Sequence, residues 1–174
     1  EYFNAAADRL AMILDASCYG LGGILLLDGV PISWFASPLS RHDELIHKKK
    51  IGDGTGQQIW EALAVLVGLR IWKDIWVERR MMMSLKSDSK SALSIAARLK
   101  TSKNANQIGR KIAYLYTEAA YQPRYVTHVP GVANVMADAL SRLTDPTKHY
   151  QIPKELLTVK RVEVPLRTRD WYKT

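Results

Sequence analysis

The first part of the chain carries short apolar runs separated by turn signals, a pattern typical of β-strands. Residues 9–17 and 20–27 are two such runs, and Asp28-Gly29 joins the second to a third run at residues 30–36. An Asp-Gly pair between apolar runs is a strong signal for a two-residue hairpin. The pattern therefore predicts a three-stranded antiparallel meander, preceded by a lead-in segment at residues 1–9.

After a polar loop predicted at residues 37–56, the apolar spacing becomes helical. Trp60, Leu63, Ala64, Val67 and Ile71 recur at intervals of three and four, which predicts a long amphipathic helix over residues 57–75. The elements expected beyond it are a strand at residues 81–87, helices at 89–99 and 104–121, a strand at 125–128 and a helix at 134–143. This order favours the α/β class, with a mixed sheet that has helices on both faces.

The periodic pattern dissolves after Thr144. Residues 145–174 contain Pro146, Pro153 and Pro165 among scattered basic side chains. This composition is typical of a linker or an extended arm, so we expect one domain over residues 10–144 and a basic tail outside its core.

Composition limits the class of protein. The 174 residues are 47% hydrophobic and carry a net charge of +8, which favours a folded domain with an anionic partner such as nucleic acid. The single cysteine, Cys18, excludes an internal disulfide. No apolar run is long enough to cross a bilayer, so we expect no membrane partner. With one cysteine we expect a reducing compartment and an intracellular protein, cytoplasmic or nuclear. The start at Glu1 is compatible with a trimmed chain or a piece of a polyprotein.

Four carboxylates occupy positions where one site could form. Asp15 ends the first strand, Glu61 lies near the start of the long helix, Asp88 follows the strand at residues 81–87, and Asp138 lies on the last helix. If the two strands are parallel neighbours, their acids emerge at one edge of the sheet. Clustered carboxylates suit Mg²⁺ or Mn²⁺, and paired ions are suited to phosphodiester hydrolysis. Taken singly, each acid could equally be a turn residue, a helix cap or a solvated charge.

Four motifs carry a resemblance to a known family. They are DASCYGLGG at residues 15–23, QQIWEALA at 57–64, SDSKSAL at 87–93 and HVPGVANVMADALSR at 128–142. These sequences resemble the ribonuclease H family, most of all the ribonuclease H domains of Ty3/gypsy-type LTR retrotransposons. The resemblance covers residues 10–143 and implies a ribonuclease H-like fold, in which a five-stranded mixed sheet combines a three-stranded antiparallel meander with two parallel strands.

The resemblance also implies a site. Two Mg²⁺ or Mn²⁺ ions would be held by Asp15, Glu61, Asp88 and Asp138, with the assignment of acids to ions left open. His128 precedes Asp138 by 138 − 128 = 10 residues and would assist leaving-group protonation or product release, unless it makes only a structural hydrogen bond. The residues expected to contact the substrate through its minor groove are Ser17, Cys18, Gln57, Gln58, Ser89, Lys90 and Asn134.

The implied activity is endonucleolytic hydrolysis of the RNA strand of RNA/DNA hybrids. The expected partner is a reverse transcriptase domain in cis or in trans, in a retroelement polyprotein or particle, and the isolated domain is expected to be a monomer. Between Leu99 and Asn104 there is no room for the extra basic helix with which many cellular relatives hold substrate, so affinity should be weak in isolation.

Several alternatives stay open. The chain could be a ribonuclease H-like binding or connecting module with weak or no activity, a related integrase or resolvase, or a basic scaffold. The lysines at residues 48–50 and the group Lys100, Lys103, Arg110 and Lys111 are candidates for phosphate contacts or for a solvated face. Trp60, Trp72 and Trp76 are better explained as helix residues packed on the sheet than as bases for stacking.

Overall fold

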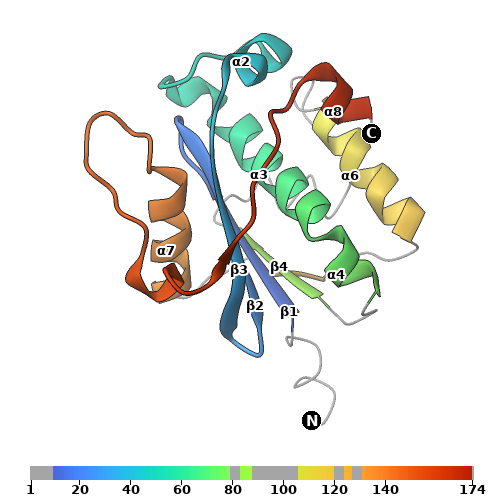
Figure 1. Ribbon diagram of the computed structural model, residues 1–174. Coiled ribbons are helices and arrows are strands. Elements are labelled where there is room, and N and C mark those ends of the chain that lie inside the picture. The colour runs from blue at the N-terminus through green and yellow to red at the C-terminus, as the bar shows by residue number, and fades with distance from the viewer. Residues whose placement is uncertain (1–9, 79–82, 88–105, 120–123, 127–130, 174) are drawn as a thin grey trace.

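The computed structural model describes residues 10–78, 83–87, 106–119, 124–126 and 131–173. Its strands form one mixed sheet in the order β5-β4-β1-β2-β3-β6 (Figure 1). Their bounds are β1 Leu10–Ala16, β2 Gly20–Leu27, β3 Val30–Pro38, β4 Met83–Ser87, β5 Arg124–Val126 and β6 Lys160–Arg161. The meander β1-β2-β3 is antiparallel, β4 pairs in parallel with β1, and β5 pairs in parallel with β4, as expected. The sixth strand was not predicted.

The hairpin between β2 and β3 turns on the Asp-Gly pair. Asp28 and Gly29 both have positive φ angles, 51° and 79°, as a type I′ turn requires. The twist of this turn matches that of the flanking strands, so the pair sets the register Leu27↔Val30. The hairpin prediction is confirmed.

The helices depart from the predictions in two places. The loop expected at residues 37–56 contains the helix α2 (Arg41–His47) and the 3-10 turn η1 (Gly54–Gly56), and the long helix is divided at Trp72 into α3 (Gln57–Ile71) and α4 (Lys73–Glu78). The later helices are α6 (Asn106–Ala119), α7 (Gly131–Ser141), the 3-10 turn η3 (Lys154–Leu156) and α8 (Arg169–Lys173). The helix expected at residues 89–99 lies outside the described residues. In the described part of the chain, no helix is long and apolar enough to span a membrane.

Side chains of β1 alternate between two cores. Met12 and Leu14 face the layer formed by α3 and α6, whereas Ala11 and Ile13 face α7 on the other side of the sheet (Figure 1). Helix α3 is buried at every position from 59 to 69, rather than along one stripe as expected. The reason is that α6 and the aromatic residues of α8 cover the side of α3 that the sheet leaves open.

The segment after Thr144 is part of the domain. The indole Nε1 of Trp34 donates to the carbonyls of Leu156 (3.0 Å) and Val159 (3.1 Å), and β6 then pairs with β3. Leu156 belongs to the core on the α7 side, whereas Tyr172 belongs to the core on the α3 side, so the segment wraps around the β3 edge (Figure 1). The expectation of a linker or arm outside the core is therefore wrong for these residues.

Candidate active site

The candidate site is centred on the carboxyl end of β1. Asp15 is the penultimate residue of this strand and is 3% exposed. It pairs with Gly22 of β2 on one side. On the other side the parallel register ends at Leu14↔Ser87, so β1 and β4 end together at the same edge of the sheet. Asp88, the next residue after Ser87, lies outside the described residues, as do Ser89, Lys90 and His128.

Helix α3 brings Glu61 to this edge. The side-chain Nε2 of Gln57 donates one hydrogen bond to the carbonyl oxygen of Ala16 (2.6 Å) and another to Oε1 of Glu61 (2.8 Å). Gln57 and Glu61 are separated by four residues and therefore lie on the same face of the helix. Glu61 is 6% exposed. Gln57, one of the predicted substrate contacts, thus links the predicted metal ligand Glu61 to β1, the strand that carries Asp15.

Helix α7 approaches β2 closely because β2 has glycines at the contact. A Cβ atom on Gly22 would lie 2.7 Å from the Cβ of Leu140 and 2.8 Å from the carbonyl oxygen of Ala137. The Ser17 hydroxyl fastens the same helix by donating to the carbonyl of Ser141 at 2.6 Å. Since Gly22 is the partner of Asp15 in the sheet, this contact places α7 beside the candidate site.

Asp138 on α7 is paired with an arginine of the same helix. Arg142, one turn further along the helix, donates from Nε to Asp138 at 2.9 Å. This hydrogen bond raises the pKa of the Arg142 guanidinium, and Coulomb attraction to both Asp138 and Asp15 acts in the same direction. Arg142 is therefore the counter-charge of Asp138, and its guanidinium is also attracted by Asp15. No role was predicted for Arg142 from the sequence, although its i+4 spacing from Asp138 is a signal for such a pair.

The predicted substrate-binding residues divide into two groups. Ser17 is buried, and its hydroxyl donates to Ser141 and accepts from the amides of Tyr19 (3.1 Å) and Gly20 (3.2 Å), so it closes the loop after β1. Its side chain thus has a structural role where a substrate contact was expected. Cys18 and Gln57 are partly exposed, and Gln58 is fully exposed on the first turn of α3.

Asn134 is the remaining predicted substrate contact. It lies on α7 one turn before Asp138 and is partly exposed. Its Oδ1 atom is buried and accepts no hydrogen bond from the described residues. A buried acceptor without a donor typically costs about 1–3 kcal/mol.

The donor chemistry of the site fits a hard divalent cation. Asp15, Glu61 and Asp138 offer carboxylate oxygens, the ligands that Mg²⁺ and Mn²⁺ prefer. Within the described ranges, no three His, Cys, Asp or Glu side chains lie close enough together to hold a metal ion. In the described structure Glu61 accepts a hydrogen bond from the Gln57 amide, and Asp138 is paired with the guanidinium of Arg142.

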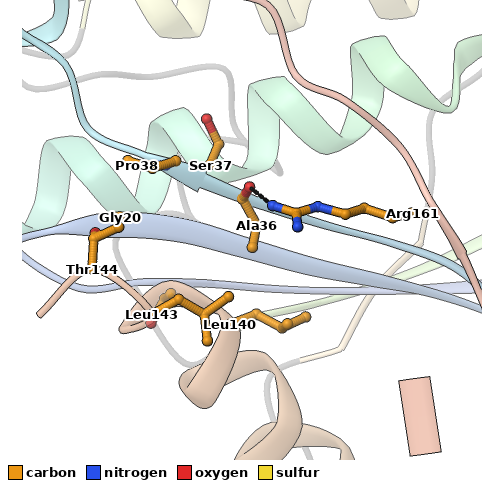
Figure 2. A pocket seen from close by; sticks show the side chains of 9 residues that line it. Gly20, Ala36, Ser37, Pro38, Leu140, Leu143, Thr144 and Arg161 are labelled. Carbon is orange, nitrogen blue, oxygen red and sulfur yellow. Dashed lines mark hydrogen bonds between the residues drawn. The ribbon is translucent and has the colours of Figure 1, made fainter. Parts of the chain in front are cut away.

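A small cavity behind the site is too small for a nucleotide. It lies between the start of β2, the end of β3 and the end of α7, and has a volume of about 70 Å³ (Figure 2). Gly20, Ala36, Leu140 and Arg161 are among its lining residues, and Arg161 donates to the Ala36 carbonyl at 3.4 Å. None of the described predicted metal ligands lines this cavity. The candidate chemistry therefore lies at the sheet edge, outside the cavity.

The strand order, the β1-β4 pairing and the helix layers define a ribonuclease H-like α/β fold. Two solved structures of ribonuclease H1 share it. One is LC11 ribonuclease H1, isolated from compost by a metagenomic approach, with a TM-score of 0.55 and 16% identity over 76% of this chain and 92% of that chain. The other, from the halophilic archaeon Halobacterium salinarum NRC-1, has a TM-score of 0.55 and 17% identity over 78% and 96%.

Sequence comparison adds nothing to the structural likeness. No protein-family model matches the chain, and no curated protein matches it. At 16% and 17% identity, the two ribonuclease H1 structures establish the fold alone.

Proposed function

We propose that this protein is a metal-dependent endoribonuclease that hydrolyses the RNA strand of RNA/DNA hybrids. The observation that carries the proposal is the placement of two motif carboxylates, Asp15 and Glu61, at the carboxyl end of β1 in a ribonuclease H-like sheet, beside the helix that carries Asp138. Asp15 is the penultimate residue of β1, Glu61 is tied to that strand through Gln57, and Asp138 is paired with Arg142 on α7. The fourth acid, Asp88, follows Ser87, whose backbone pairs beside Leu14.

Each residue has a defined part in the proposal. The carboxylates of Asp15, Glu61, Asp88 and Asp138 would hold two Mg²⁺ or Mn²⁺ ions, which when bound supply an activated water and stabilise the leaving oxygen. Gln57 orients Glu61 by hydrogen bonding one carboxylate oxygen. By the motif resemblance, Asn134 would contact a ribose hydroxyl, and His128 would move a proton near the leaving group. Cys18, Gln58, Ser89 and Lys90 would complete the contacts with the minor groove.

The biological setting is part of the same proposal and rests on the motif resemblance. We infer a retroelement origin of the Ty3/gypsy type and a reverse transcriptase domain that holds the hybrid in cis or in trans. This setting implies a monomeric domain that acts inside the cell, in a retroelement particle, in the cytoplasm or in the nucleus. The second candidate is a ribonuclease H-like binding module with weak activity, which the pairing of Asp138 with Arg142 favours.

The test compares three labelled substrates: an RNA/DNA hybrid, duplex RNA and duplex DNA, each with Mg²⁺, with Mn²⁺ and with EDTA. We expect cleavage of the hybrid alone, and only with metal. Replacing a residue that only hydrogen-bonds a metal ligand typically lowers activity by up to roughly 100-fold. Asp15→Asn and Asp88→Asn change the predicted ligands themselves, so each should reduce the cleavage rate by more than that. Glu163→Gln removes a carboxylate that is 90% exposed at its side chain and should leave the rate unchanged.

Two outcomes would overturn the proposal: equal cleavage of all three substrates, or undiminished cleavage by the Asp15 and Asp88 variants. Metal binding can be measured separately, because a ligand that binds the native state raises its melting temperature. Mg²⁺ should therefore stabilise the wild-type protein more than it stabilises Asp15→Asn. Binding of hybrid without any cleavage in Mn²⁺ would identify the second candidate, the binding module.

A further inference from the structure

A basic groove lies between α2 and α8, away from the candidate carboxylates. Its two halves have volumes of about 370 Å³ and 460 Å³ and share Leu45, Ile46, Arg169 and Lys173. The first half is also lined by Lys48, Gln107 and Tyr172, and the second by His42, Thr168 and Asp170. We call this feature the α2–α8 groove.

The groove is predominantly positively charged. Among the described residues that line its first half, Lys48, Arg169 and Lys173 are cationic and none is acidic. The second half contains one acid, Asp170, which lies 3.8 Å from the Lys173 ammonium. Both members of that pair are more than two-thirds exposed, so solvent screens it and Lys173 keeps most of its attraction for an external anion.

Helix α8 is fixed in place although it has only five residues. The Tyr172 hydroxyl lies 2.7 Å from Nε2 of His47 on α2, and Arg70 of α3 hydrogen-bonds the Trp171 carbonyl and stacks 4.2 Å from its ring. These contacts bury one side of α8 and leave Arg169 and Lys173 exposed on the other. The groove therefore presents its cations on a fixed surface, which lowers the entropic cost of binding.

The groove is connected to the loop at the candidate site. Lys48 ends α2 in the left-handed conformation (φ 56°), and four residues later the Gly52 amide donates to the Cys18 carbonyl at 2.8 Å. Four residues span at most about 14 Å. A nucleic-acid strand rises about 3.4 Å per nucleotide, so Lys48, one of the groove's cations, lies within roughly four nucleotides of that loop.

We propose that the α2–α8 groove binds the sugar-phosphate backbone of the duplex that enters the candidate site. This inference rests on the proposed function for the identity of the duplex, although the groove itself recognises phosphate. The groove would provide, from α2 and the C-terminal helix, the basic surface for which the sequence has no room between Leu99 and Asn104. A phosphate array is the partner because it matches three cations spaced along one groove.

The test uses the full chain and a fluorescent 20-base-pair RNA/DNA hybrid in EDTA, so that binding is measured without cleavage. Arg169→Gln/Lys173→Gln should weaken binding roughly tenfold at low salt and lower the slope of log K against log salt by about 1.8, two lost contacts at about 0.9 each. Arg169→Lys/Lys173→Arg keeps both charges and should restore binding. Lys154→Ala/Lys160→Ala removes two exposed cations of the same segment outside the groove and should change neither quantity.

Failure of this inference is distinguishable from failure of the proposed function. If the wild-type protein cleaves hybrids while Arg169→Gln/Lys173→Gln binds like wild type with an unchanged salt slope, the groove proposal is wrong and the nuclease proposal stands. That result would also follow if the groove instead takes an acidic protein. If no hybrid is cleaved, but the groove variant still loses duplex affinity and salt slope, the groove proposal stands alone.

Discussion

Arg167 and Asp43 form a bidentate ion pair that joins the C-terminal segment to α2. Nε of Arg167 lies 3.0 Å from Oδ1 of Asp43 and Nη2 lies 2.8 Å from Oδ2, with side chains 1% and 0% exposed. The other guanidinium hydrogens go to the Ser37 hydroxyl (2.7 Å) and to the carbonyls of Pro38 (3.1 Å) and Pro165 (3.4 Å). All five donors of the guanidinium are therefore satisfied.

Loss of Arg167 should destabilise the whole domain. Arg167→Met leaves the Asp43 carboxylate buried without its counter-charge, and breaking a buried pair in this way costs about 3–5 kcal/mol. The double variant Arg167→Met/Asp43→Leu removes both charges and should recover part of that loss. Urea denaturation gives the free energies of unfolding.

Arg161→Met is the matched control for this prediction. It makes the same chemical change on β6 at an exposed arginine, and it should cost less than about 1 kcal/mol. Equal losses from Arg161→Met and Arg167→Met would mean that the C-terminal segment is held by something other than this ion pair.

This ion pair shows why the C-terminal segment was misread from sequence. Hydrophobic periodicity reveals helices and strands, in which buried side chains recur at regular intervals. Residues 145–168 instead pack through isolated buried side chains such as Leu156 and Arg167. An isolated arginine between Leu166 and Thr168 has no local signal, because its partner is 124 residues away. By contrast, the Asp28-Gly29 hairpin was predictable because a two-residue turn determines its own geometry.

The candidate site, too, was predictable from the sequence only in part. The positions of Asp15 and Glu61 follow from the strand and helix patterns, and the structure describes both at the carboxyl end of β1. The structural role of Ser17 was not predictable, because its hydrogen bond to Ser141 requires the approach of α7 to a distant glycine strand. Patterns along the chain predict elements, while contacts between elements decide which side chains remain available to a ligand.

Gly22 should be essential for the position of α7. Gly22→Ala places a Cβ atom 2.7 Å from Leu140 and 2.8 Å from the Ser141 amide, so the helix must move. Overpacking of this kind typically costs about 1–3 kcal/mol. Because Asp138 moves with α7, nuclease activity should fall by more than the fraction of unfolded protein explains, as measured by activity and circular dichroism on the same sample.

Gly54→Ala is the control for Gly22→Ala. No atom lies within 4 Å of the added Cβ at Gly54, so this variant should have wild-type activity. Its stability should be unchanged or slightly higher, because alanine restricts the unfolded chain. Full activity in Gly22→Ala would show that the close contact between β2 and α7 does not position the site.

Protonation of His47 should destabilise the fold between neutral and acidic pH. Burial lowers the pKa of His47 from 6.5 to about 4, with Asp43 opposing this shift and Arg167 adding to it. Above pH 6.5, His47 is neutral in both states and its contribution to stability is complete. As the pH falls from 6.5 to 4, the unfolded chain binds a proton that the folded protein excludes, so about 3 kcal/mol is lost at roughly 1.4 per pH unit.

The measurement is the free energy of unfolding in urea at intervals from pH 8 to pH 4. His47→Gln cannot titrate, so the difference between wild type and this variant isolates the contribution of His47 from those of His42, His128 and His149. Tyr172→Phe removes the 2.7 Å hydrogen bond but keeps the ring, and it should retain the pH slope. A difference between wild type and His47→Gln that does not vary with pH would contradict the prediction.

Arg142 should compete with divalent metal for Asp138. In the described structure its guanidinium occupies Asp138 at 2.9 Å and is attracted by Asp15, so a cation that binds these acids must displace or repel it. Arg142→Gln removes that charge, and the concentration of Mg²⁺ at half-maximal hybrid cleavage should fall roughly three- to tenfold. Both side chains of the pair are more than one-third exposed, so solvent screening keeps the change within this range.

Arg142→Lys separates charge from geometry in the same assay. Lysine keeps the positive charge near Asp15 and Asp138 but loses the Nε contact, so its Mg²⁺ requirement should stay close to that of the wild type if repulsion between cations is the cause. A higher Mg²⁺ requirement in Arg142→Gln would mean the opposite role, in which the arginine holds Asp138 in the position that a metal needs. Titration of Mg²⁺ against melting temperature gives the same comparison without catalysis, because only metal bound to the native state shifts the transition.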